Sequence, residues 1–313
     1  MSFISVVDTH QLFPVITLID NKVNTSVELY AFGSVLNKFE FKVGGETVNI
    51  VDGFVSPQEA ISQMTPAFKS AFLSPFTCRM NQGKYQFDDT AYQIEKFFLP
   101  PHAIHGLVFD AMFTVDKVES TEDFAAVQLS YTYNKEDDGY PFSYTVTHYW
   151  KLERGNKLTV ASTVTHNNTH AIPYAQGWHP YFKLGNTIDE CLLQFSADRQ
   201  VEFDETLLPS GNIIDDERFT LGANLAGINL DNCFHLSPNQ QPVCVLSNQS
   251  IKLVIEPDAS YPFLQVYTPP HRKSIAIENL SGAPDCFNNK MGLHFIEPQS
   301  CSIFTTSFTA TTL

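Results

Sequence analysis

The chain has 313 residues, of which 43% are hydrophobic and 17% are charged, and its net charge is −15. Because globular domains carry about 25% charged residues, this chain has ample apolar material for a core, which argues against disorder. The acidic balance and the lack of a basic run argue against binding to nucleic acid or to an anionic membrane, and no apolar stretch approaches the roughly 20 residues of a membrane helix. The first residues lack the basic and apolar segments of a signal peptide, so we expect a cytoplasmic protein.

Alternation of apolar and polar residues recurs along the chain in segments of strand length, separated by polar turns. We expect strands at Val15–Ile19, Ser26–Phe32, Ala125–Tyr133, Phe142–Trp150, Lys157–Thr165, Val243–Leu246, Ile251–Ile255, Phe263–Tyr267, Ser274–Ile277 and Ser302–Phe308. The three segments between residues 125 and 165 are joined by short polar loops, which is typical of an antiparallel meander.

Helix is expected only in two short segments, Pro57–Met64 and Asp204–Leu208. The sequence shows no βαβ alternation, which argues against a doubly wound parallel sheet, and no Pro-, Gly- or Ser-rich linker. It therefore predicts an all-β protein, a large antiparallel β-sandwich with few short helices, that forms a single domain over residues 1–313.

The cysteines are widely scattered and include no C-x-x-C pair, so the spacing predicts neither a disulfide framework nor a zinc-thiolate site. We expect reduced and mostly buried thiols. The six positions are Cys78, Cys191, Cys233, Cys244, Cys286 and Cys301.

Two early segments place a polar side chain where it could bind a ligand. Arg79 lies among apolar residues before a turn, where it would form either a surface salt bridge or a clamp for an anion or hydroxyl group. His105 follows two prolines and precedes Gly106, which indicates an irregular loop whose backbone can approach a ligand. His102 lies three residues before His105, but no further ligand nearby completes a metal site.

Three later segments also carry candidates. His179 stands among aromatic residues and Pro180, as either a proton donor or a hydrogen-bonded core residue. Asp231 lies between apolar neighbours, where capping of a turn is the default role. Glu278 ends an apolar strand, where partial desolvation would raise its pKa and strengthen it as a base.

His166 and His170 have the i, i+4 spacing of metal ligands. Their Asn-rich surroundings indicate a turn after a strand, so we expect both side chains to be solvated.

Taken together, these segments resemble the aldose 1-epimerase (galactose mutarotase) superfamily in type and order. The most specific likenesses are Trp178–Phe182, similar to "H-P-Y-F", and Glu278 followed by Pro284–Asn288, similar to "E-x-x-x-x-P-D-x-F-N". Weaker likenesses are found at Ala31–Leu36, Phe76–Arg79, Ile104–Gly106, Tyr140–Phe142 and Leu230–Phe234. The chain departs from the best-known galactose mutarotases at Cys78, where those enzymes have Asn, and at Pro180, where they have Ser.

The resemblance implies a β-supersandwich with a sugar site on a concave sheet face. It implies that Glu278 is the catalytic base, that His179 is the acid, that His105 lies near the sugar ring, and that Arg79 and Asp231 bind hydroxyl groups. Trp178 or Tyr181 could stack on the apolar face of a pyranose, although core packing is equally open for each.

The function that follows is interconversion of the α and β anomers of an aldohexose by general acid–base ring opening, with no metal, nucleotide or redox cofactor. Three alternatives remain open: a hexose-6-phosphate 1-epimerase, a glycosidase that uses Asp231 and Glu278, and a sugar-binding protein without catalytic activity.

Overall fold

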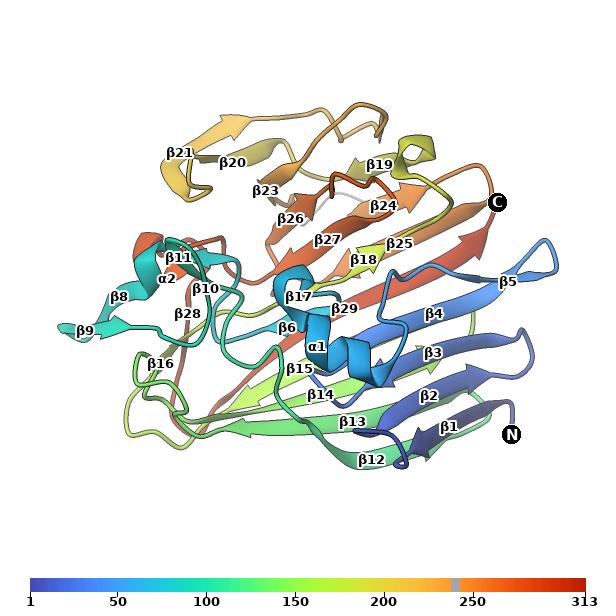
Figure 1. The fold of residues 1–313 in the computed structure, drawn as a ribbon, viewed down its shortest axis with the longest axis horizontal. Helices are drawn as coiled ribbons and strands as arrows, with labels where there is room; N and C mark the ends of the chain where they lie inside the picture. The colour runs from blue at the N-terminus through green and yellow to red at the C-terminus, as the bar shows by residue number, and fades with distance from the viewer. Residues whose placement is uncertain (238–242) are drawn as a thin grey trace.

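Three large antiparallel sheets dominate the chain over residues 1–237 and 243–313, the residues that the computed structural model describes (Figure 1). The first has five strands in sequence order: β1 (Phe3–Asp8), β2 (Val15–Asp20), β3 (Thr25–Tyr30), β4 (Val35–Val43) and β5 (Glu46–Asn49). The second has nine strands, in the order β12 (Thr114–Ser120), β13 (Phe124–Tyr133), β14 (Tyr144–Glu153), β15 (Lys157–Thr165), β29 (Cys301–Thr312), β25 (Ile251–Pro257), β24 (Cys244–Ser247), β19 (Leu192–Phe195) and β22 (Ala223–Asn224).

The third sheet has eight strands. Seven follow the order β21 (Pro209–Asp215), β20 (Arg199–Phe203), β23 (Asp231–His235), β26 (Phe263–Tyr267), β27 (Ile275–Leu280), β17 (Gly177–His179) and β6 (Ala71–Leu73), and β18 (Tyr181–Phe182) also pairs with β27.

Small sheets and short helices complete the described part of the chain. The small sheets are β10 (Phe98–Leu99), β11 (His102–Ile104) and β7 (Arg79–Met80); β16 (Ile172–Tyr174) with β28 (His294–Ile296); and β8 (Lys84–Phe87) with β9 (Thr90–Gln93). The helices are α1 (Pro57–Ala67), α2 (Cys286–Asn289) and two 3₁₀ turns at Asn81–Gly83 and Ile188–Glu190. None of the helices in the described residues is long and apolar enough to cross a membrane.

The five-stranded and eight-stranded sheets are joined edge to edge. The Asp52 amide donates to the Tyr181 carbonyl, and the Lys183 amide donates to the Ile50 carbonyl, each at 2.9 Å. Figure 1 shows the long strands of the nine-stranded sheet running behind both.

The core fills the space between these layers. Trp178 of β17 packs against His148 and Trp150 of β14, with ring centroids 4.8 and 5.1 Å apart. Residues of β14 alternate between buried and half-exposed along the whole strand, because only one face of that sheet contacts the core. The predicted β-sandwich is confirmed.

Strand alternation directs odd and even residues of β27 to opposite faces of the eight-stranded sheet. The Asn279 side-chain amide donates to Thr306 of the nine-stranded sheet at 2.8 Å, so Asn279 faces the core and Glu278 faces away from it. On that outer face lies a second apolar cluster, which includes Met64 of α1, Phe68 and Leu280. Polar side chains on this face are therefore enclosed rather than solvated.

Helix α1 covers part of this outer face. Ser56 caps its first turn by accepting a hydrogen bond from the Glu59 amide at 3.2 Å, and Pro57 occupies the first helical position, where its missing N–H costs nothing. Phe68 ends the helix in a left-handed conformation and donates its amide hydrogen to the Met64 carbonyl.

All ten predicted strands and the helix predicted at Pro57–Met64 are present, with ends shifted by a few residues. The helix predicted at Asp204–Leu208 is wrong. The Asp204 side chain accepts hydrogen bonds from the Thr206 and Leu208 amides, which closes a turn between β20 and β21 instead.

Two further expectations need correction. Glu278 lies inside β27 rather than at its end, because pairing with β26 continues to Leu280. His166 is buried rather than solvated: its Nε2 lies 2.7 Å from the Ile296 carbonyl, whereas His170 is exposed, as expected.

Candidate active site

Glu278 and His179 meet on the outer face of the eight-stranded sheet. Their strands, β27 and β17, pair side by side, and His179 Nε2 lies 3.2 Å from Glu278 Oε1. Only 5% of His179 and 2% of Glu278 are exposed. A carboxyl group and an imidazole in direct contact, both shielded from bulk solvent, can exchange a proton with each other and with a bound molecule.

Pro180 interrupts the strand that carries His179. Gly177 and Trp178 pair with one part of β27, and Tyr181 and Phe182 pair with another. Proline has no amide hydrogen, so it fits the break between the two paired stretches, and its carbonyl accepts from the Ile277 amide at 3.2 Å. The register with β27 continues across Pro180, so His179 and Tyr181, two residues apart, face the same side of the sheet.

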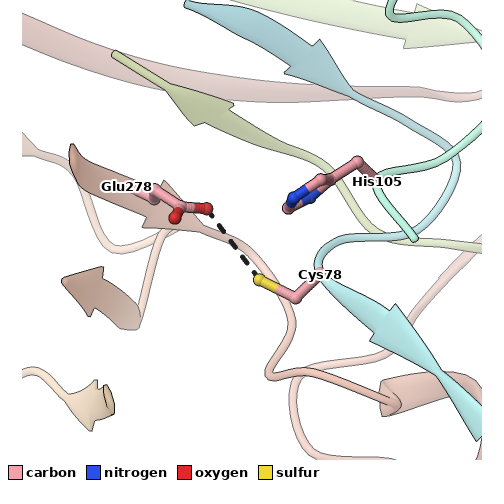
Figure 2. Close-up of side chains that lie close together, drawn as sticks. All are labelled: Cys78, His105 and Glu278. Carbon is pink, nitrogen blue, oxygen red and sulfur yellow. Dashed lines mark hydrogen bonds between the residues drawn. The ribbon is translucent and has the colours of Figure 1, made fainter. Parts of the chain in front are cut away.

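Cys78 and His105 approach the same point from two loops. Both residues have left-handed backbones, with φ values of 48° and 63°, and the His105 amide donates to the Cys78 carbonyl at 2.9 Å. Such conformations cost about 1–3 kcal/mol each and cluster where a site needs a fixed geometry. Figure 2 shows the two side chains turned toward Glu278, and the Cys78 thiol donates to Glu278 Oε2 at 3.9 Å.

These groups line a cavity of about 190 Å³. At roughly 30 Å³ per water molecule, this is the space of about six waters, enough for one small polar molecule. Its lining residues are Ala67, Phe68, Cys78, Arg79, Phe97, Leu99, Ile104, His105, His179, Tyr181, Asp231, Gln265, Tyr267 and Glu278. Larger grooves of about 900 and 740 Å³ flank the β8–β9 hairpin and contain none of the predicted site residues.

Arg79 and Asp231 reach this cavity from two different strands. Arg79 begins β7. Two hydrogen bonds with Asp285 hold this strand in place: the Asp285 amide donates to the Arg79 carbonyl at 2.7 Å, and Asp285 Oδ1 accepts from the Asn81 amide. Asp231 begins β23 and accepts from Gln265 Nε2 at 2.7 Å. The structure therefore gives the P-D-x-F-N segment a role in positioning Arg79.

Several residues that line the cavity carry a buried polar atom without a hydrogen-bond partner in the protein. His105 Nδ1, His179 Nδ1 and Gln265 Oε1 account for three of the seven such side-chain atoms in residues 1–237 and 243–313. An unsatisfied buried group costs about 1–3 kcal/mol, so their concentration here indicates a site that a polar ligand completes.

Burial controls the protonation of the Glu278–His179 pair. It lowers the pKa of His179 to about 4 and raises the pKa of Glu278 well above its ordinary value, with a further upward contribution from the charge of Asp231. Both shifts favour the uncharged groups, that is, a single proton on Glu278 beside a neutral His179. That proton count is the same as for an ionised Glu278 beside a protonated His179, and transfer across the 3.2 Å contact interconverts the two forms.

Two neighbouring groups have shifted pKa values for the same reason. Burial lowers the pKa of His105 well below its ordinary value, helped by His179 and Arg79, so its ring is neutral. Burial also raises the pKa of Asp231, against the opposing effects of Arg79 and the Gln265 hydrogen bond.

The structure brings together Arg79, His105, His179, Tyr181, Asp231 and Glu278, and it separates Trp178 from them. Trp178 points into the sandwich core, where its Nε1 donates to the Tyr261 hydroxyl at 3.1 Å, so it does not reach the cavity. Sequence reasoning missed Gln265, Tyr267 and Phe68. Gln265 was detectable as the one polar residue in the strand Phe263–Tyr267, directly paired with Glu278.

A β-sandwich with a buried acid–base pair beside a cavity for one small molecule is typical of an enzyme that acts on a small polar substrate. Comparison with known proteins identifies the family. The family model for aldose 1-epimerase matches residues 14–299, and the chain belongs to this family.

Solved structures agree on the fold. A GalM/aldose epimerase homologue from C. elegans is 22% identical, with a TM-score of 0.83, over 94% of this chain and 98% of that one. A galactose 1-epimerase from Lactobacillus acidophilus is 18% identical, with a TM-score of 0.83, over 99% and 98% of the two chains. A galactose mutarotase-like protein from Clostridium acetobutylicum is 16% identical, with a TM-score of 0.85 and the same coverage. The comparison with curated proteins gave no match.

Gly106 offers a test of how tightly the His105 loop is held. It has φ +78°, and a Cβ there would lie 2.3 Å from the Ser74 carbonyl oxygen. Gly155, in the turn between β14 and β15, has the same φ but open space around it. Gly155→Ala should cost about 1–2 kcal/mol from the left-handed backbone alone, and Gly106→Ala about 1–3 kcal/mol more from the collision. Urea unfolding of the two variants measures the difference, and equal losses would show that the loop yields freely.

Proposed function

We propose that this protein is an aldose 1-epimerase that interconverts the α and β anomers of an aldohexose in the Glu278 cavity. The proposal rests mainly on the 3.2 Å contact between Glu278 and His179, which are buried beside a cavity lined by Arg79, His105 and Asp231. Membership of the aldose 1-epimerase family supports it.

Ring opening moves two protons. Ionised Glu278 takes the proton of the C1 hydroxyl, the C1–O bond to the ring oxygen breaks as the carbonyl forms, and protonated His179 delivers a proton to the ring oxygen. Rotation about C1–C2 presents the other carbonyl face, and closure reverses both transfers. Opening leaves Glu278 protonated and His179 neutral, which is the form that burial favours.

The remaining polar residues position the sugar. Arg79 and Asp231 offer a donor fork and an acceptor for hydroxyl groups, and His105 lies against His179 with ring centroids 4.9 Å apart, close to where the ring oxygen must sit. Tyr181, 5.1 Å from the His179 ring, supplies an aromatic face beside the acid.

A phosphorylated hexose fits this cavity less well. Arg79 is the one Lys or Arg side chain among the described residues that line it, and Asp231 and Glu278 would repel a phosphate. Comparison of exchange rates for glucose and glucose 6-phosphate decides between the two substrates.

Loss of the base should abolish most of the activity. Glu278→Gln keeps the shape of the side chain but cannot accept the C1 proton, so kcat should fall by about 10²–10⁴-fold, and His179→Gln should act similarly through loss of the acid. Exchange NMR on equilibrated galactose and glucose measures the rate. Glu46→Gln, an exposed substitution on β5, serves as the control and should exchange anomers at the wild-type rate. A wild-type rate in Glu278→Gln would show that another group is the base.

Loss of the hydroxyl-binding groups should weaken binding instead. Arg79→Ala and Asp231→Ala each remove charged hydrogen bonds worth about 1.5–3 kcal/mol, which corresponds to a rise in KM of roughly 10- to 100-fold. His105→Ala should raise KM and also lower kcat, because of its place beside the acid. Initial rates by polarimetry measure both constants, and an unchanged KM in all three variants would contradict the assignment.

The pH dependence of kcat/KM should form a broad bell, since the singly protonated pair is the active form. The acid limb marks gain of a second proton and should lie near pH 4, because burial lowers the pKa of His179 to about 4. The alkaline limb marks loss of the single proton and should lie far above the ordinary range of a Glu carboxyl, because burial raises the pKa of Glu278. Rates corrected for spontaneous exchange test this, and an acid limb near the ordinary pKa of histidine would argue that the pair is solvated.

A further inference from the structure

Cys78, His105 and Glu278 place three different metal-ligating side chains on one wall of the cavity (Figure 2). All three are buried, and one ligand atom from each lies within 4.8 Å of the others. Cys78 and Glu278 are 200 positions apart in the chain, so the spacing of these residues in the sequence did not indicate this cluster.

The separations are close to those of a zinc site. Sulfur and oxygen ligands at about 2.3 and 2.1 Å from a tetrahedral Zn²⁺ lie about 3.6 Å apart. The Cys78 sulfur and Glu278 Oε2 are 3.9 Å apart, so they need to approach by only a few tenths of an ångström. Figure 2 shows the His105 ring nitrogens turned toward both, so modest side-chain rotations would complete three bonds.

His105 provides a second observation that points to a metal ligand. The side chain is only 7% exposed, and its Nδ1 is buried without a hydrogen-bond partner. Its loop is held to that of Cys78 by the 2.9 Å backbone hydrogen bond between them, so the two ligands keep their relative position without metal. A neutral imidazole offers a lone pair to a cation directly.

The types of ligand atom indicate which metal ion would bind. One thiolate, one imidazole and one carboxylate suit Zn²⁺ or Cd²⁺, whereas Mg²⁺ and Ca²⁺ require oxygen ligands. Binding would release the thiol proton of Cys78 and the carboxyl proton of Glu278 to solvent. The two anionic ligands then balance the charge of the ion, which leaves the buried site neutral.

We propose that Cys78, His105 and Glu278 bind one Zn²⁺ ion in the cavity, and that this ion inhibits anomer exchange by occupying the oxygen of Glu278 that must accept the sugar proton. The fourth position of the ion faces the cavity, where water or a sugar hydroxyl completes the coordination. The binding site stands independently of the proposed function, whereas the inhibition rests on it.

The binding test uses protein freed of metal with a chelator. Titration with Zn²⁺ by calorimetry should show one equivalent, and titration with Cd²⁺ should produce the ultraviolet charge-transfer absorption of a Cd–thiolate bond. Cys78→Ser should lose that absorption and weaken Zn²⁺ binding about tenfold or more. Cys301→Ser is the matched control, because Cys301 is the exposed thiol and lies outside the cavity.

Binding that is equally strong in Cys78→Ser would overturn the site. Cadmium NMR on the wild-type protein gives a second readout that needs no variant. A chemical shift typical of one sulfur ligand with nitrogen and oxygen supports the site, and one typical of oxygen ligands alone overturns it.

The inhibition test uses the same proteins. Zn²⁺ should slow exchange in the wild type and in Cys301→Ser, a chelator should restore the rate, and Cys78→Ser should require about tenfold more Zn²⁺ for the same fractional loss. Zinc binding with an undiminished rate would overturn the inhibition alone. An absence of exchange in metal-free wild type would overturn the proposed function and leave the binding result intact.

Discussion

The contact between Glu278 and His179 depends on exclusion of water, and much of the structure provides that exclusion. Alternation along β27 and β17 sends both side chains to the outer face of the eight-stranded sheet. Helix α1, Phe68 and the loops of Cys78 and His105 then enclose that face, so the acid–base pair lies beneath an apolar cluster rather than in solvent. Burial makes the uncharged forms favourable and leaves one proton for two sites, which is the state that a reversible proton transfer needs.

Burial of polar groups without hydrogen-bond partners costs folding free energy, and part of this cost falls on the residues that line the cavity. His105, His179 and Gln265, which line the cavity, each carry a buried nitrogen or oxygen without a hydrogen-bond partner, and Cys78 and His105 have left-handed backbones. These features destabilise the empty protein, and a bound sugar that satisfies the polar atoms would recover part of that free energy. Cys78 adds a thiol where the best-known galactose mutarotases have Asn, which gives this wall a donor set that a zinc ion can use.

The sequence predicted the strands and most of the polar residues that meet at the cavity, because both leave local patterns. Ten strands were visible as two-residue periodicity, and the H-P-Y-F and P-D-x-F-N segments identified His179 and Glu278. Features that arise from long-range packing were not visible: Trp178 alternates into the core, and Asp204 closes a turn with its own side chain. The approach of Cys78 to His105 depends on a backbone hydrogen bond between two loops, which no spacing within either loop encodes.

We expect burial to keep one proton on the Glu278–His179 pair at neutral pH, and infrared difference spectroscopy measures this directly. Subtraction of the Glu278→Gln spectrum from that of the wild-type protein isolates the carbonyl stretch of a single carboxyl group. Because burial raises the pKa of Glu278, a protonated carboxylic acid band should persist through neutral pH and disappear only in alkaline solution. A carboxylate band across the neutral range, with titration at the ordinary value for Glu, would contradict it.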